Sequence, residues 1–272
     1  MLHLLSKLLI TLKVKSYPLI KRSLNIINKC IPLGTILLVI GIWAFICAEN
    51  IVPAFMLPSP SDVVDAFIRD FPLLMQHASV TLVEAFWGLM LGIGIGFIFA
   101  ILMDEFNVIY RGFYPLIVLT QTIPTIAIAP LLVLWMGYGM APKVLLVALT
   151  TFFPITIGLL DGFKSVDKDM TDLMRAMGAG KVKIFRHIKL PGSMTPFFSS
   201  LKISVTYSIV AAVISEWLGG FEGLGVYMIR VKKSYAFDEM FAVILLISIL
   251  SLVLMKLIDV LKYTTQKWER AK

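Results

Sequence analysis

Few residues in this sequence have the types and spacing that catalysis or metal binding would require. The two cysteines, Cys30 and Cys47, belong to no CxxC pair, and no histidine belongs to an HExxH sequence. The Gly180–Lys181 pair lacks the upstream glycine and the following Ser or Thr of a phosphate-binding loop. We therefore expect no catalytic residue, no metal site and no nucleotide held by this chain.

The composition of the 272-residue chain indicates a membrane protein. Hydrophobic residues make up 58% of the sequence and charged residues only 15%, whereas ordinary globular domains contain about 25% charged residues. The mean hydropathy is +0.89. Because so few charges cannot cover a water-exposed surface, lipid is expected to cover most of it, which excludes a soluble enzyme, a disordered regulator and a coiled coil.

Long stretches without charge predict an all-α, polytopic membrane protein with six transmembrane helices. Each needs about 20 mostly apolar residues to cross the bilayer, and the segments that qualify are 31–48, 79–103, 113–136, 143–160, 197–218 and 240–261. Within the second segment, Gly88, Gly92 and Gly96 form GxxxG steps, which let another helix approach closely.

The basic residues predict the orientation. With six spans and a cytoplasmic N-terminus, most of the 25 Lys and Arg residues fall on the cytoplasmic side, as the positive-inside rule requires. We expect both termini of a cell-membrane protein to be cytoplasmic, with a six-span body at 31–262 and a tail at 263–272. The basic segment 1–30 is either an amphipathic helix on the inner leaflet or a loosely ordered tail. The net charge of +8 then reflects topology, and nucleic-acid binding is not expected.

The longest polar stretch, 161–195, joins the fourth and fifth predicted spans on the cytoplasmic side. It predicts two short amphipathic helices, the first ended by Gly178 and Gly180 and the second by Pro191. Their apolar faces need a partner, which is either the protein's own spans or another chain.

This stretch resembles the signature loop of binding-protein-dependent ABC importer permeases, which reads E-A-A, three residues, G, nine residues, I-x-L-P. Gly178 matches the glycine, and Ile188, Leu190 and Pro191 match the I-x-L-P at the same spacing. Asp172 keeps the acidic position, whereas the two alanines are replaced. LPSP at 57–60, QTIPTIAIAPLLVLW at 121–135 and SEWLGGFEGLGVYM at 215–228 resemble the branch that serves sulfonate, taurine, nitrate and thiamine-precursor uptake.

The resemblance implies a MetI-like fold and a permease subunit of an ATP-driven importer. Such a chain forms the pathway for a small solute, here a sulfonate-like anion or a thiamine-pyrimidine-like precursor, delivered by an extracytoplasmic solute-binding protein. The implied partners are two copies of an ATPase subunit, which bind ATP and Mg²⁺, and a second permease chain, most simply as a homodimer. The loop would form a coupling helix against the ATPase, with contacts at Asp172, Gly178, Ile188, Leu190 and Pro191, to which helical facing adds Arg175 and Phe185.

Candidate pathway residues lie in the third and fifth spans. Pro115, Pro124 and Pro130 interrupt segment 113–136, and a broken span must lie against protein or a water-filled cavity. The polar candidates are Gln121, Thr122, Ser204, Tyr207, Ser208 and Ser215. For the serines, the alternative is a packing face between helices.

Glu216 is an acid near the outer end of the fifth span. Together with Gly219 and Gly220 it is a candidate outer gate or docking contact. The alternative, which we prefer for Glu216, is an interfacial ion pair with Arg230 or Lys232. Two other functions stay open: a non-transporting scaffold, and an ion-coupled carrier, which would need ionisable residues in the middle of the spans.

Overall fold

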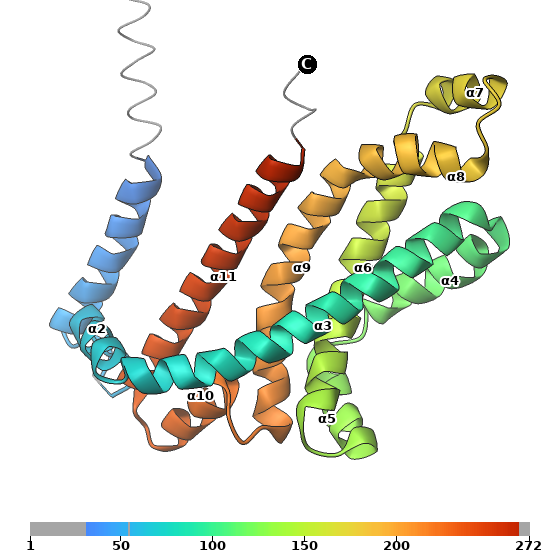
Figure 1. Ribbon diagram of the computed structural model, residues 1–272. Helices are drawn as coiled ribbons and strands as arrows, with labels where there is room; N and C mark the ends of the chain where they lie inside the picture. Colours follow the sequence, from blue (N-terminus) through green and yellow to red (C-terminus); the bar gives the residue numbers. More distant parts are fainter. Residues whose placement is uncertain (1–30, 54, 267–272) are drawn as a thin grey trace, which may run out of the picture. The chain divides into compact units, whose positions relative to one another are not determined.

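The computed structural model describes residues 31–53 and 55–266, and every regular element in these residues is a helix (Figure 1). The all-α prediction is thus confirmed. The predicted segment 1–30 and residues 267–272 of the predicted tail lie outside the described part. The chain divides into two compact units between Asp65 and Ala66.

The first unit contains the helix Ile31–Ala48, which coincides with the first predicted span. The indole of Trp43 donates a hydrogen bond of 3.0 Å to the carbonyl of Pro58, so the chain folds back beside this helix. Ser59 then caps α2 (Pro60–Arg69): its hydroxyl accepts from the amide of Asp62, whose carboxylate accepts from the amide of Ser59. This reciprocal capping explains why α2 begins there.

The second unit holds the remaining helices (Figure 1). In chain order they are α3 (Phe71–Glu105), α4 (Asn107–Thr120), α5 (Thr125–Met136), α6 (Met140–Lys164), α7 (Lys168–Ala176), α8 (Lys181–Ile184), α9 (Leu190–Gly219), α10 (Leu224–Lys233) and α11 (Phe237–Thr265). In the described residues of the whole chain, five helices are long and apolar enough to span a membrane, or six if the bent pair α4 and α5 is one span.

Glycines set the close packing of α3 against α6. A Cβ atom at Gly88 would lie 2.8 Å from the carbonyl oxygen of Val144, and one at Gly96 would lie 3.2 Å from that of Phe152. Such distances leave no room for a side chain, so the GxxxG prediction is confirmed. The buried core continues between α6 and α9 through Ile155, Leu159 and Leu201, among others.

The third predicted span is two helices with a bend of 100° between them. Pro124, with φ −58°, stands directly before α5, where its missing amide hydrogen costs nothing, whereas Pro115 and Pro130 lie inside helices. The prediction of a broken span is right, and the break is at residues 121–124.

The fifth span differs from its prediction. Instead of beginning at 197, the helix runs continuously from Lys181 to Gly219, with a π turn at Phe185–Lys189. In that turn the amide of Leu190 donates to the carbonyl of Phe185, five residues earlier. The expectation that Pro191 ends the second short helix is wrong, because the wider turn before it accommodates a residue without an amide hydrogen.

Candidate functional site

The first helix of the polar loop 161–195, α7, is built by local interactions. The carboxylate of Asp167 accepts a hydrogen bond of 2.9 Å from the amide of Asp169, which caps the N-terminus. Arg175 and Asp172 form an ion pair of 2.9 Å one turn apart, and both side chains are about two-thirds exposed. The pair therefore remains accessible from the solvent, where a partner could reach it.

Gly178 ends α7 through its backbone conformation. Its φ is +82°, and a Cβ there would meet no atom within 4 Å. Its amide donates to the carbonyl of Arg175, and the amide of Ala179 donates to that of Met174, each at 2.9 Å. This is a Schellman motif, in which the left-handed residue is usually glycine. Glycine is thus needed at position 178 because of the positive φ, and not because a side chain would collide with its surroundings.

An apolar face of α7 is exposed. The helix, which is described in full, has no buried residue. Met170, Leu173 and Met177 follow the i, i+3, i+7 spacing of one helical face, and Leu173 is 62% exposed and Met177 75% exposed. The protein's own spans do not cover these side chains.

The second half of the loop packs on the protein itself. Ile184 and Ile188 are buried, and the ring of Phe185 packs edge-on against Phe163 at 5.4 Å between centroids. Leu190 and Pro191 are half-buried. The sequence left open whether the apolar faces of the two short helices meet the protein's own spans or another chain. In the described residues, the apolar face of the first helix is uncovered, whereas that of the second packs on the protein's own core.

Two ion pairs that sequence reasoning missed hold the loop to the end of α3. Lys189 pairs with Asp104 at 2.7 Å, and Lys181 pairs with Glu105. A polar hollow of about 530 Å³, lined among others by Asp104, Lys168 and Lys189, separates α7 from the spans. The loop is therefore anchored through its second half, and α7 projects from this anchor.

Of the candidate pathway residues, some are exposed on the surface of this chain and the others are buried inside it. Gln121 and Thr122 are exposed in the break before α5, and Tyr207 is exposed on α9. Ser204 and Ser215 are buried; the hydroxyl of Ser204 donates to the carbonyl of Thr151 in α6. These serines lie in the packed interior of this chain, which is the alternative the sequence left open.

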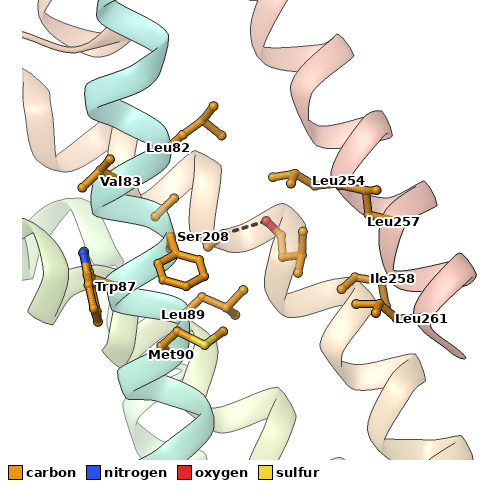
Figure 2. A pocket seen from close by; sticks show the side chains of 13 residues that line it. Leu82, Val83, Trp87, Leu89, Met90, Ser208, Leu254, Leu257, Ile258 and Leu261 are labelled. Atoms are coloured by element: carbon orange, nitrogen blue, oxygen red, sulfur yellow. Dashed lines mark hydrogen bonds between the residues drawn. The ribbon is translucent and has the colours of Figure 1, made fainter. Parts of the chain in front are cut away.

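Ser208 lies at an apolar pocket of about 480 Å³ between α3 and α11 (Figure 2). Its hydroxyl donates at 2.8 Å to the carbonyl of Val205 in its own helix, as the dashed line shows. Leucines from both walls, such as Leu82 and Leu254, surround it. The hydroxyl's bond is made inside α9, so Ser208 also belongs to the packing set.

At the other end of the unit, Glu216 is buried, with 1% of its surface exposed. One carboxylate oxygen accepts from the hydroxyl of Thr81 at 2.7 Å, and the other accepts from the amide of Gly225 at 2.5 Å. The preferred interfacial ion pair with Arg230 or Lys232 is therefore wrong. The carboxylate points into the protein, where a helix start and a hydroxyl satisfy it.

Two neighbouring amides at the start of α10 are bound in the same way. The amide of Leu224 donates to the hydroxyl oxygen of Thr81 at 2.9 Å, and that of Gly223 donates to Nδ1 of His77 at 3.1 Å. His77 and Thr81 lie one turn apart on α3. Sequence reasoning missed both, although their i, i+4 spacing with Glu84 three residues further places them on one helical face.

Glu84 forms a buried ion pair with Lys143 of α6 at 2.6 Å, and both side chains are almost fully buried. In the first turn of α10, the Tyr227 hydroxyl donates to Glu239, which also pairs with Arg69. Burial and the nearby Glu239 carboxylate raise the pKa of the Tyr227 phenol. The buried polar contacts of Thr81, Glu84 and Glu216 thus join α3, α6, α9 and α10.

This all-helical body, with five or six candidate membrane spans in its described residues and an exposed amphipathic helix between two of them, is that of a multi-pass membrane protein. Residues 92–268 match the family described as the binding-protein-dependent transport system inner membrane component, and this chain belongs to that family. It is 37% identical over 227 residues to a probable ABC transporter permease of Haemophilus influenzae, covering 82% of this chain and 93% of that protein. It is 35% identical to the formylaminopyrimidine transport permease ThiX of Halalkalibacterium halodurans, covering 86% and 94% of the two chains.

A solved structure of the MetNI methionine ABC transporter, in inward-facing conformations, has the same fold. Its TM-score is 0.66 at 18% identity, and the match covers 73% of this chain and 99% of that one. The MetI-like fold expected from the sequence is confirmed. The chain is a multi-pass inner-membrane transport subunit of an ABC importer and not an enzyme, since ATP hydrolysis belongs to a separate chain in this family. The family implies an ATPase and a solute-binding protein as partners.

Proposed function

We propose that α7 is the coupling helix that connects this permease to its ATPase subunit. The observation that carries this proposal is the exposed apolar face of Met170, Leu173 and Met177 on a helix in a cytoplasmic loop. An apolar face bordered by the Asp172–Arg175 ion pair fits a socket with an apolar floor and a polar rim. ATP can change the conformation of the permease only through contacts that differ between the two states, and α7 supplies such contacts.

The predicted contact residues take different parts in this coupling. Asp172, Arg175 and Gly178 lie on or at the end of α7 and meet the ATPase directly or shape the helix that does. Phe185 and Ile188 pack on the core and hold the base of the loop. Leu190 and Pro191 are the first residues of α9 and follow that base directly, so that force applied to α7 reaches the membrane-spanning helix.

The complete transporter is a homodimer of this chain with two ATPase subunits, and both termini are cytoplasmic. Within the second unit, the C-terminal end of α11 lies at the same end as α7 and α8 (Figure 1). That placement supports a cytoplasmic C-terminus beside the ATPase. Gln121, Thr122 and Tyr207, all exposed in the single chain, line the pathway between the two permeases. Glu216, Gly219 and Gly220 belong to its outer gate.

The solute is a formylaminopyrimidine-like thiamine precursor. The permease named for that solute is 35% identical to this chain, whereas the aliphatic sulfonate permease SsuC of Bacillus subtilis is 25% identical. Lys143 and Lys202, which lie within α6 and α9, are each paired with a carboxylate. This supports a solute without a sulfonate group. Uptake by the reconstituted complex with its binding protein, competed by a formylaminopyrimidine or by taurine, tests the choice.

A substitution on α7 tests the coupling role. Leu173→Asp places a charge on the apolar face, and we expect ATPase co-purification and solute-stimulated ATP hydrolysis to fall about tenfold or more. Val108→Asp is the matched control, because Val108 is an exposed apolar residue at the start of α4. Equal behaviour of the two variants would contradict the assignment.

A further inference from the structure

The start of α10 is capped by other helices. Its own N-cap residue is Gly223, which has no side chain to offer. Three consecutive amides, at residues 223, 224 and 225, are bound instead by His77 and Thr81 of α3 and by Glu216 of α9. Since unbound amides at a buried helix start are costly, α10 keeps its place only while α3 and α9 keep theirs.

The backbone at this place is shaped for the carboxylate. Gly223 has a φ of +121°, and a Cβ there would lie 2.6 Å from Oε2 of Glu216. A Cβ at Gly225 would lie 3.0 Å from the same oxygen. Both residues must therefore be glycine for the Glu216 side chain to fit against this turn and accept the bond from the Gly225 amide.

The long helix α6 is also held at the start of α10, through an ion pair with α3. Lys143 of α6 pairs with Glu84, which lies one turn beyond Thr81 on α3. The Nζ atom of Lys143 also lies close to the end of α9, since it would be 3.2 Å from a Cβ atom at Gly220. Charged and hydrogen-bonded contacts thus connect the ends of α3, α6, α9 and α10.

α5 lies outside this network. It is bordered on one side by the 100° bend and on the other by Gly137 and Gly139, with φ values of +77° and +143°. Cβ atoms at these two glycines would meet nothing within 4 Å. Trp135, near the end of α5, is 71% exposed. Hinges are a few positions at element ends that absorb changes of φ and ψ, and both ends of α5 supply such positions, while Ala129 and Leu132 pack its middle on Leu146 of α6.

We propose that Glu216 is a positioning residue for transport. With Thr81 and His77 it holds α10 on α3 and α9, so that the outer ends of these helices move as one body. α5 is the element that moves against this body when the pathway opens. The inference rests on the proposed function, because it assumes that the α4–α5 break lines the pathway.

Two variants of Thr81 test the positioning role in the reconstituted transporter. Thr81→Val removes the hydroxyl that bridges Glu216 and α10 and keeps the shape, whereas Thr81→Ser keeps the hydroxyl. Loss of these buried hydrogen bonds should lower the solute transported per ATP hydrolysed about tenfold in Thr81→Val, and Thr81→Ser should resemble the wild type. A purely structural role would lower the amount of complex and leave this ratio unchanged, which would overturn the proposal. ATPase co-purification should stay normal in both variants, and it reports separately on the coupling role of α7.

A cross-link tests the movement of α5 even if Thr81→Val fails to assemble. Cγ2 of Val133 in α5 lies 3.1 Å from the position of a Cβ at Gly219 in α9, which is compatible with a disulfide. The pair Val133→Cys and Gly219→Cys, in a chain with Cys30→Ser and Cys47→Ser, should lose uptake about tenfold or more on oxidation and regain it with a reductant. Each single variant is a control. Uptake that is the same in the oxidised and reduced complexes would show that α5 does not move against α9.

Discussion

The carboxylate of Glu216 accepts a hydrogen bond of 2.5 Å from the backbone amide of Gly225, nine residues further along the chain. The intervening residues form the turn between α9 and α10, so this bond links the end of α9 to the start of α10 across the turn. It gives the buried carboxyl group a partner without a lysine or arginine, since the start of a helix carries partial positive charge.

Gly178 should tolerate only residues that accept a left-handed conformation. Gly178→Ala meets open space, but its positive φ should cost about 1 kcal/mol and loosen the end of α7. We expect weaker ATPase co-purification from this variant. Gly178→Asn should be milder, because asparagine visits this region more easily.

Gly180→Ala is the matched control for this position. Gly180 has an ordinary φ of −71° and open space around it. Its substitution should leave co-purification and solute-stimulated ATP hydrolysis unchanged. If Gly178→Ala and Gly180→Ala behaved alike, the Schellman motif would not be what α7 requires.

The buried pair Glu84–Lys143 should show strong non-additivity. Lys143→Met leaves Glu84 buried without its partner, which should destabilise the protein by about 3–5 kcal/mol. Adding Glu84→Gln to Lys143→Met removes the unpaired charge and should recover most of the loss. Thermal unfolding of the purified complex in detergent measures both, and a double variant no better than Lys143→Met would refute the ion pair.

The α3–α6 contact should distinguish a glycine of α3 that faces α6 from one that does not. Gly88→Ala places a methyl group 2.8 Å from the carbonyl of Val144, so we expect a loss of about 1–3 kcal/mol. Gly94→Ala meets nothing within 4 Å and should be neutral or slightly stabilising. Melting temperatures of the two variants check this, and equal values would contradict the packing.

Sequence reasoning reached the features that local pattern determines. Charge-free stretches located the spans, and the GxxxG steps of α3 indicated the contact with α6. Gly178 in the polar loop 161–195 could be recognised from its place in the pattern. These features depend on residues close together in the chain, so their spacing carries the information.

Features that depend on distant partners could not be reached in this way. The bond between Glu216 and Thr81 joins residues 135 positions apart, and the other partner of Glu216 is a backbone amide, which leaves no trace in residue type. The burial of Ser204 depends on which face of α9 meets α6. The π turn before Pro191 was missed because a proline ordinarily indicates a helix boundary.

The most direct test of the coupling role is thiol labelling of a Leu173→Cys variant in a chain with Cys30→Ser and Cys47→Ser. In inside-out vesicles, a membrane-impermeant maleimide should label this position when the ATPase subunit has been removed and should fail to do so when it is bound. A Val108→Cys control should be labelled in both cases. Labelling of the Leu173→Cys variant that is unaffected by the ATPase, or that occurs from the outer surface, would contradict the account.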